Sequence, residues 1–435
     1  MAECRTIIAA QQNETARRKK VRGKELGYIG FLRANARLLA FGAVAAFASS
    51  FGQTFFISLF NAPLQAELGL GSGRIGLLYS SATLCSALSL MWLGRKIDHW
   101  DLRLYTLLAC LLMILGTGLM SLAGSGAVLA VAFYLLRISG QGLLSHISLT
   151  SMARYFDGAR GRAIGLASIG FPAGEALLPI CAVSLIAWIG WRQSWQLIAV
   201  IVAVLMIPAL LWCLKGHAAR HAAITAAATA AQATAQNTSR PAASRLMIAD
   251  RRFLLCLPTA MASPFIITGL FFHQATIAAA KGWSLDWLAL CFVAFAVIQA
   301  LTTFQSGHLV DRFGAIRLMP VYLLPMAAAL IVLSLWPTPI AALIYMIGIG
   351  VTSGLDTTIG TSVWAELFGV QRLGSIRATV SALSVFASAL SPVIFGTLID
   401  HAITVDAIAL GCMLYCLACA VISLRLRRAA LPQTA

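Results

Sequence analysis

SGHLVDRFGAIR, residues 306–317, is a short polar stretch with a histidine, an aspartate and two arginines between two long apolar runs. A similar stretch, LGRKIDHWDLR, begins 213 positions earlier and covers residues 93–103. Only 11% of the 435 residues are charged, so charges gathered at two such joints call for an explanation. The apolar runs that flank the joints are long enough to cross a bilayer. This alternation of long runs and polar joints decides the expected fold.

The whole chain has the composition of a membrane protein. Hydrophobic residues make up 60% of it, and the mean hydropathy is +0.85, whereas a soluble domain is only about half apolar. Lipid offers no hydrogen-bond partners, so long apolar segments satisfy their backbone groups as helices. We therefore expect an all-α membrane protein with twelve transmembrane helices, near residues 37–60, 75–93, 104–123, 127–150, 163–185, 195–214, 254–277, 287–305, 318–336, 340–364, 377–399 and 405–424.

Basic residues are unevenly distributed over the joints between these segments. With the N-terminus inside, the outer loops hold only Arg74, Arg192 and Lys281, and Arg137 lies within a span. The other 28 of the 32 basic residues fall in inner segments, as the positive-inside rule requires. This predicts an integral protein of the plasma (inner) membrane with both termini cytoplasmic. The net charge of +17 then reflects orientation in the membrane, and we expect no nucleic-acid partner.

A stretch rich in Ala, Thr and Gln divides the twelve segments into two halves of six. It has no apolar face to bury, so it is typical of a linker. The expected organisation is a basic cytoplasmic tail (1–36), an N-terminal six-helix bundle (37–214), a cytoplasmic linker (215–252), a C-terminal six-helix bundle (253–424) and a cytoplasmic tail (425–435).

The two halves also repeat weakly in sequence. The pairs that match at an offset of 212 or 213 positions are Gly142 and Gly354, Ala153 and Ala365, Phe156 and Phe368, Arg160 and Arg372, Gly94 and Gly307, and Asp98 and Asp311. Internal duplication is typical of secondary transporters, in which two bundles move about a site near the membrane midplane. We therefore expect the two six-helix bundles to be pseudo-symmetric.

The two polar stretches resemble the signature loop of the major facilitator superfamily, which joins the second and third helices of each half. The matching residues are Gly94, Asp98 and Arg103 in the first copy, and Gly307, Asp311 and Arg312 in the second. The resemblance implies a conformational latch that holds the bundles in an outward-facing state. In it the glycine admits a close helix approach, and the aspartate caps a helix or pairs with arginine. The alternative for each copy alone is a solvated turn.

Three further stretches strengthen this resemblance. LLRISGQGLL (135–144) resembles the Arg-x-x-Gln-Gly element of the superfamily, and GLASIGFPAGEALLP (165–179) resembles its glycine and proline element. The joint MARYFDGARGRAIGLASIG (152–170) is most similar to the monocarboxylate-porter branch. That branch implies transport of small organic acids, often together with a proton.

Three charged residues, Arg137, Glu175 and Asp356, fall well inside expected spans. A charge there costs about 2.5 to 3.5 kcal/mol on insertion scales, so each is a functional candidate. At about 1.5 Å per residue, Arg137 and Glu175 lie about 16 and 15 Å below the outer ends of their helices. We expect them to pair or to face each other across a cavity, with Arg137 as a fork for a substrate carboxylate and Glu175 as a proton carrier. The alternative is a permanent structural ion pair.

Five polar residues are weaker candidates for contact with substrate or protons. Asp356 is either a second proton carrier or binding group, or a cap for a kink in its own helix. His146 and His273 can titrate near neutral pH, although a helical histidine more often packs through a hydrogen bond. Gln53 and Gln274 are candidates for contact with polar groups of a substrate.

Motifs of other protein classes do not occur in the sequence. It has no Gly-x-Ser-x-Gly, no His-Glu-x-x-His and no nucleotide-phosphate loop, so we expect neither an enzyme nor a primary pump. We also expect no cofactor and no metal, because the ten cysteines are placed as small hydrophobic residues.

The expected function is secondary active transport of a small, monocarboxylate-like organic anion in symport with protons, by a monomer embedded in membrane lipid. The alternative is a proton-coupled efflux antiporter for a lipophilic drug or cation, which Glu175 and Asp356 would meet. The environment of Arg137 discriminates between them. Access to solvent favours an anion, whereas closure by Glu175 leaves Asp356 to attract a cation.

Overall fold

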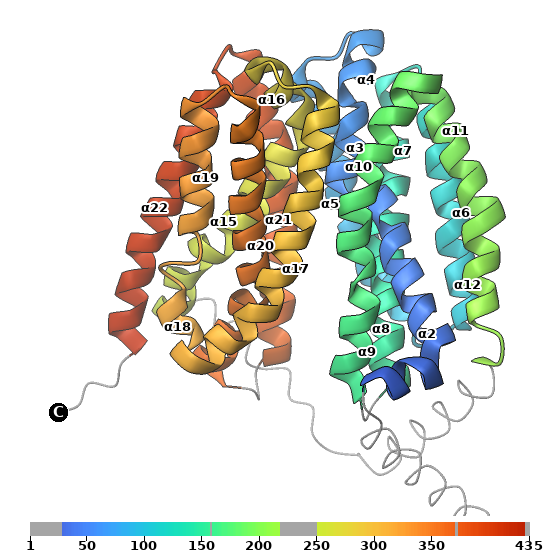
Figure 1. Ribbon diagram of the computed structural model, residues 1–435, viewed down its shortest axis with the longest axis horizontal. Coiled ribbons are helices and arrows are strands. Elements are labelled where there is room, and N and C mark those ends of the chain that lie inside the picture. The colour runs from blue at the N-terminus through green and yellow to red at the C-terminus, as the bar shows by residue number, and fades with distance from the viewer. Residues whose placement is uncertain (1–27, 157–158, 218–249, 370–372, 431–435) are drawn as a thin grey trace, which may run out of the picture.

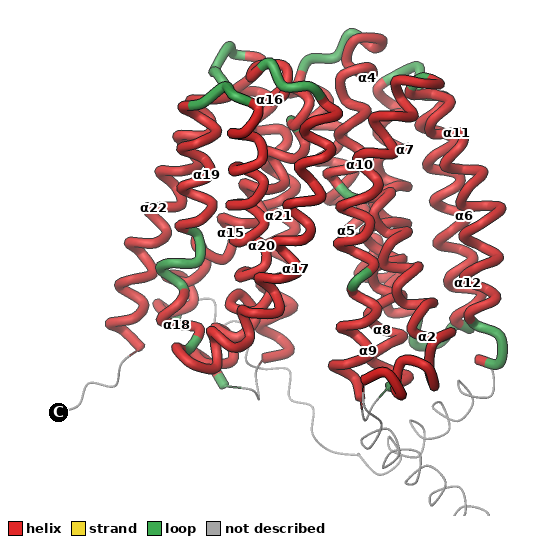
Figure 2. Tube along the Cα trace, in the orientation of Figure 1, coloured by secondary structure: helices red, strands yellow, loops and turns green. Residues whose placement is uncertain are grey.

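The computed structural model describes residues 28–156, 159–217, 250–369 and 373–430, and within them it has helices and turns but no strand (Figure 2). In these ranges eleven helices are long and apolar enough to cross a membrane, and one further apolar helix, Leu324–Leu335, is shorter. Large apolar side chains remain on the surface, such as Phe304 and Trp188, as a lipid-facing surface requires. The predicted all-α membrane fold is confirmed. Most of the expected linker and of the N-terminal tail lies outside the described residues.

The N-terminal bundle forms one side of the molecule (Figure 1). Its helices are α2 (Tyr28–Ser49), α5 (Ser72–Lys96), α6 (Leu102–Ser121), α7 (Gly126–Leu136) continued by the π-helical η3 (Arg137–Leu144) and α8 (Ser145–Tyr155), α9 (Arg160–Ser168) followed by α10 (Gly170–Ile189), and α11 (Trp191–Ile201) continued by η5 (Val202–Met206) and α12 (Ile207–Cys213). Short elements η1 (Ser50–Gly52), α3 (Thr54–Ile57), η2 (Ser58–Phe60) and α4 (Asn61–Leu68) extend α2.

The C-terminal bundle lies beside it (Figure 1). Its helices are α15 (Arg251–Phe272) with α16 (Gln274–Lys281), α17 (Leu285–Phe313), α18 (Ala315–Leu318), α19 (Leu324–Leu335), α20 (Pro339–Phe368), α21 (Leu373–Asp400) and α22 (Val405–Ala430). Within this bundle α17 packs closely on α20. The close approach depends on Gly350 and Gly354, because a side chain at either position would stand within 3 Å of the α17 backbone.

Local capping residues set several helix ends. Asp101 accepts a hydrogen bond from the N–H of Arg103 at the start of α6, and Asp250 accepts one from Arg252 at the start of α15, both 2.8 Å long. Each aspartate satisfies a backbone donor that has no partner within the helix. At the other end of a helix, α17 stops at Gly314, where φ is +80°, a conformation that glycine adopts without strain.

The ninth expected span, 318–336, is interrupted, which corrects the sequence prediction. α18 ends at Leu318, residues 319–323 form turns, and α19 begins only at Leu324. Pro320 lies within the interruption, and Pro325 is the second residue of α19. Proline lacks the N–H that would continue the helix, so the regular segment shortens to the 12 residues of α19.

The molecule has two distinct ends. We call the end at which α2 begins and α22 ends the basic end, and the end at which α5 begins and α21 ends the opposite end (Figure 1). The bundles meet along two helix pairs, α5 with α21 and α10 with α17. These contacts are not equally tight along the length of the molecule.

Hydrogen bonds and close backbone contacts join the bundles at the opposite end. The Asp400 carboxylate, at the end of α21, accepts hydrogen bonds from the N–H groups of Ser72 and Gly73 at the start of α5, both 2.8 Å. One turn further along α5, a side chain at Gly76 would stand 2.3 Å from the carbonyl oxygen of Pro392. Only glycine therefore allows α5 and α21 to approach this closely.

The short elements after α2 and α15 complete the closure. The Asn61 side chain donates to the carbonyl of Phe272, and the Gln274 side chain donates to the carbonyl of Phe55. Every hydrogen bond between the bundles within the described residues joins segments near the opposite end. This conformation is thus sealed at the opposite end, with no such bond at the basic end among those residues.

Candidate functional site

The first helix of each bundle is broken near the region where the bundles meet. In the N-terminal bundle, Gln53 is extended, with φ −86° and ψ 153°, and separates η1 from α3. In the C-terminal bundle, His273 has φ −101° and ψ 19° and separates α15 from α16. Breaks in membrane helices leave backbone groups without helical partners, and such groups are available to side chains and ligands.

Arg137 lies against the first of these breaks. It is the first residue of the π-helical η3, and only 4% of it is exposed. Its Nη1 atom donates to the carbonyl of Gly52 at 3.3 Å, and to the Thr54 hydroxyl at 3.5 Å. The backbones of Gly52 and Gly140 approach closely because both residues are glycine. A side chain on Gly140 would stand 2.6 Å from the Gly52 backbone. The break therefore supplies the oxygen atoms that receive the guanidinium.

Tyr79 of α5 separates Arg137 from the C-terminal bundle. The guanidinium lies 5.2 Å from the centre of the tyrosine ring, and the tyrosine hydroxyl contacts the Thr54 hydroxyl at 2.8 Å. The tyrosine ring also packs against Phe272 of α15, with ring centres 4.5 Å apart, and against Phe133 of α7, at 5.4 Å. Tyr79 thus forms the contact between the buried cation and the other bundle. Sequence reasoning missed it, because a lone tyrosine within an apolar span carries no distinguishing signal.

Glu175 also lies near the first break but does not reach Arg137. Its neighbour Gly174 packs against Ser50 of η1, so α10 contacts the break from a different helix than η3 does. The Glu175 Oε2 atom is buried and has no hydrogen-bond partner. Among the described residues no ion pair joins Arg137 and Glu175 in this conformation, so of the two expected arrangements, a pair or opposition across a cavity, the pair is not formed here.

The weaker candidates divide between the two breaks and the bundle interior. His273 and Gln274 adjoin the second break, where the His273 ring bonds to the carbonyl of Pro392 at 2.8 Å and Gln274 crosses to the other bundle. Gln53 is part of the first break, but no side-chain hydrogen bond of Gln53 occurs within the described residues. Asp356 lies beside the hydroxyl groups of Ser263 and Tyr322, both in the C-terminal bundle, so its position favours a role inside that bundle.

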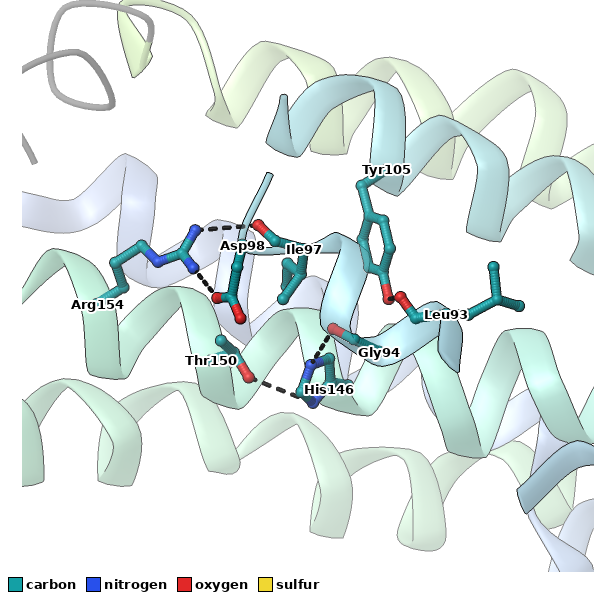
Figure 3. A network of polar contacts seen from close by, with 8 residues as sticks. All are labelled: Leu93, Gly94, Ile97, Asp98, Tyr105, His146, Thr150 and Arg154. Atoms are coloured by element: carbon teal, nitrogen blue, oxygen red, sulfur yellow. Dashed lines mark hydrogen bonds and ion pairs between the residues drawn. The ribbon is translucent and has the colours of Figure 1, made fainter. Parts of the chain in front are cut away.

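The first copy of the expected latch forms a network within the N-terminal bundle (Figure 3). Asp98 pairs with Arg154 of α8, and Arg154 also donates to the carbonyl of Ile97 at 3.0 Å. His146 bonds to the carbonyl of Gly94 at 3.2 Å, so this histidine ties α8 to α5. The network holds the joint after α5 against α8. In the part of the chain that the structure describes, the contacts of this network stay within the N-terminal bundle.

The latch role of Arg103 and Gly94 belongs to an outward-facing state and stays a prediction. In this conformation Arg103 donates to the carbonyl of Leu214 at 2.9 Å, and the arginine that pairs with Asp98 is Arg154. The nearest atom to a side chain built at Gly94 is 3.7 Å away, an ordinary contact, so no close helix approach depends on this glycine here. Sequence reasoning missed Arg154 because it is far from the loop motif in sequence.

The second copy of the latch is looser. A side chain at Gly307 would meet open space, and Asp311 has no hydrogen bond or ion pair within the described residues. Arg312 lies over the ring of its neighbour Phe313. The joint is held instead by Glu366 of α20, which accepts hydrogen bonds from the first two N–H groups of α18 at 2.7 and 3.2 Å. Glu366 stands 212 positions after Arg154, so the two joints use opposite charges at equivalent positions.

Comparison with known proteins agrees with this architecture. The family model described as Major Facilitator Superfamily matches residues 42–289 and 265–435. The chain belongs to the major facilitator superfamily. No curated protein matches it in sequence.

Solved structures of transporters share the fold of this superfamily member. A bacterial homolog of the human lysosomal transporter Spinster, in an inward-facing and occupied conformation, is 17% identical with a TM-score of 0.65, over 91% of this chain and 96% of that chain. The nucleoside transporter NupG is 12% identical with a TM-score of 0.67, over 90% of this chain and 98% of that chain. These likenesses extend to the fold alone, and the similarity to the monocarboxylate-porter branch stays a prediction.

Proposed function

We propose that this superfamily member is a secondary active transporter that moves a small organic anion across the membrane together with a proton. The observation that carries the proposal is the buried guanidinium of Arg137, which has no carboxylate partner among the described residues. A buried charge is costly unless it is paired. A substrate carboxylate would supply the missing partner.

The donors of Arg137 suit such a substrate. A guanidinium offers five N–H groups in a plane and can hold a carboxylate through two parallel hydrogen bonds. In the described conformation Nη1 is engaged by Gly52 and Thr54, while the Nε atom is buried without a partner. Arg137 is only 4% exposed, so it lacks in this conformation the solvent access that would favour an anion, but its cover is Tyr79 and not Glu175. Movement of the tyrosine ring would therefore open the cation to a ligand without breaking an ion pair.

Glu175 is the proposed proton carrier. Glu175 is partly buried, and its Oε2 atom is enclosed without a hydrogen-bond partner, which makes ionisation of the carboxyl group costly. Loss or gain of a proton at Glu175 would thus be linked to a change in its surroundings, such as the entry of water when the bundles separate. Gly174, next to Glu175, contacts Ser50 of η1, and Arg137 donates to Gly52 of η1, so one movement of η1 would alter the surroundings of both charged residues.

Alternating access accounts for the asymmetry between the two ends. The opposite end is closed by Asp400, Asn61 and Gln274, and the described residues at the basic end share no hydrogen bond across the bundles. The positive-inside pattern assigns the basic end to the cytoplasm. The described conformation would then be closed to the outside, and transport requires that the outer contacts break while contacts at the basic end form.

Uptake into proteoliposomes tests the proposal. A panel of carboxylates and organic cations is offered with and without an imposed proton gradient, using the wild-type protein and the variants Arg137→Gln and Glu175→Gln. We expect uptake of one or more carboxylates, its loss in Arg137→Gln, and in Glu175→Gln retained exchange without uphill accumulation. Arg95→Gln is a control, since Arg95 is exposed at the basic end.

Each part of the proposal can fail separately. Transport of cations only would overturn the anion assignment in favour of a cation antiporter. If Arg137→Gln takes up carboxylates as fast as the wild-type protein does, Arg137 is not part of the substrate site. Uphill accumulation that is unchanged in Glu175→Gln would reject the role of Glu175 in proton coupling.

A further inference from the structure

A hollow of about 280 Å³ opens at the basic end of the N-terminal bundle, away from the region between the bundles. It lies between the start of α2 and the residues that follow α12. Its walls are the segment 33–38, Tyr155, Cys213, Lys215, Gly216 and His217. The volume exceeds that of a phosphate group several times, so a headgroup or a hydrated anion fits within it.

The side chains around the hollow are positively charged. Arg33, Arg37 and Lys215 line it, and no acidic residue does so among the described residues. Arg33 and Lys215 are exposed, and neither side chain has a hydrogen-bond or ion-pair partner in the described part of the chain. The charged groups of Arg33 and Lys215 therefore line the same hollow, and their N–H donors have no partner in the described part of the chain.

Arg37 fixes the geometry of the hollow. Its Nη2 atom donates to the carbonyls of Trp212, in the last turn of α12, and of Lys215, in the turn that follows, at 3.2 and 2.8 Å. The guanidinium also lies 5.4 Å from the centre of the Trp212 ring. Arg37 thus joins the first and last helices of the bundle and keeps its positive charge at the wall.

Buried polar side chains form the inner wall of the hollow. His217 is only 5% exposed, and its ring contacts the Tyr155 hydroxyl at 3.2 Å and the Asp101 carboxylate at 3.3 Å. Asp101 contacts this histidine but does not line the hollow, so its negative charge lies behind the wall. Tyr155 presents its side chain to both His217 and the hollow.

The surroundings place the hollow at the level of lipid headgroups. Trp212 is 54% exposed and Leu32 is 42% exposed, so an aromatic and an aliphatic side chain flank the cations on the outer surface. Tryptophan beside basic residues at a helix end is typical of the membrane interface, and basic pockets between helices on the cytoplasmic side bind lipid headgroups.

We propose that this hollow binds a phosphate group, carried by an anionic phospholipid or free in solution, through Arg33, Arg37 and Lys215. The bound phosphate bridges the start of α2 and the end of α12 and so stabilises the N-terminal bundle. This site is separate from Arg137 and Glu175, and it stands whether or not the proposed transport function holds.

Thermal unfolding of the purified full chain, titrated with phosphatidylglycerol, phosphatidylcholine or inorganic phosphate, tests the site. The test variant is Arg33→Gln with Lys215→Gln. The control is Arg95→Gln with Arg425→Gln, which removes two exposed charges from the same end of the molecule. We expect phosphatidylglycerol to raise the unfolding temperature of the wild type and the control. In the test variant the half-saturating concentration should be about 30-fold higher, because two basic contacts are lost.

Comparison of the three titrations identifies the source of the phosphate group. A response to phosphatidylglycerol alone assigns the site to a lipid, and a response to inorganic phosphate as well assigns it to the phosphate group itself. Lipid retained on the protein, counted by native mass spectrometry, gives a second readout that does not depend on stability. No response to either anion, or an equal response and equal lipid retention in the test variant and the control, overturns the proposal.

Discussion

Replacement of Asp400 by asparagine should open the opposite end of the molecule. The carboxylate accepts two hydrogen bonds of 2.8 Å from the first N–H groups of α5, and the start of this helix carries a partial positive charge. Hydrogen bonds to a charged group contribute about 1.5 to 3 kcal/mol each. The asparagine side chain would keep one acceptor oxygen and lose the charge. Because Asp400 is exposed, we take the lower end of the range and expect a loss of about 2 kcal/mol.

This loss would shift the equilibrium between closed and open forms about 30-fold toward the open form, since each 1.4 kcal/mol is about tenfold. Spin labels on Gly124→Cys and Thr338→Cys, in a background without native cysteines, report the separation of the bundles at this end. Both positions lie in exposed loops, one in each bundle. Asp400→Asn should populate a longer distance that is rare in the wild-type protein.

Asp286→Asn is the matched control, because Asp286 is exposed at the start of α17 and has no ion pair within the described residues. It should leave the distance distribution unchanged. If Asp400→Asn and the wild-type protein give the same distribution, the carboxylate does not hold the opposite end closed and the reasoning is refuted.

Three further substitutions test the contacts that shape the fold. Arg192 donates to Glu67 and lowers the pKa of this carboxyl below its ordinary value of 4.5. The Glu67–Arg192 pair therefore stabilises the fold above pH 4.5, and this stabilisation is lost as the pH falls through the lowered pKa of Glu67. Glu67→Gln should flatten this decline of thermal stability at acid pH. An unchanged decline would contradict the role of the pair. Asp250→Ala removes the N-cap of α15 and should cost about 1 kcal/mol in thermal unfolding, whereas Asp250→Asn should retain most of it; equal losses would argue against capping. Gly76→Ala places a methyl group 2.3 Å from the carbonyl oxygen of Pro392, so the spin-label distance should lengthen, and a distance that stays short would show that α21 can adapt.

Hydropathy predicted most of the fold because it is a local property of the chain. Each apolar run must satisfy its own backbone in lipid, so the run length alone indicates a helix. The same reasoning failed at the ninth span, where Pro320 and Pro325 interrupt the helix within an apolar run. It also did not predict the breaks at Gln53 and His273, since neither residue is a helix breaker by itself.

The candidate site was predicted in its charged residues but not in their partners. Arg137 and Glu175 stood out because a charge in an apolar run is costly. Their contacts depend on how far each helix is rotated about its axis and on which faces meet, and the rotation is decided by packing between distant segments. Tyr79 and Thr54 contact Arg137 for this reason, while Glu175 forms no ion pair with it among the described residues.

The sequence by itself predicted an all-α membrane fold with few buried charges, and the described residues form eleven long apolar helices and one shorter one. Backbone hydrogen bonding in lipid and the cost of a charge are both settled residue by residue. Only the tertiary structure decided that Arg154 is the arginine that pairs with Asp98, and that Asp400 joins α21 to the start of α5 at the opposite end. Such pairings join segments up to 328 positions apart, and no local pattern specifies which helix faces come together.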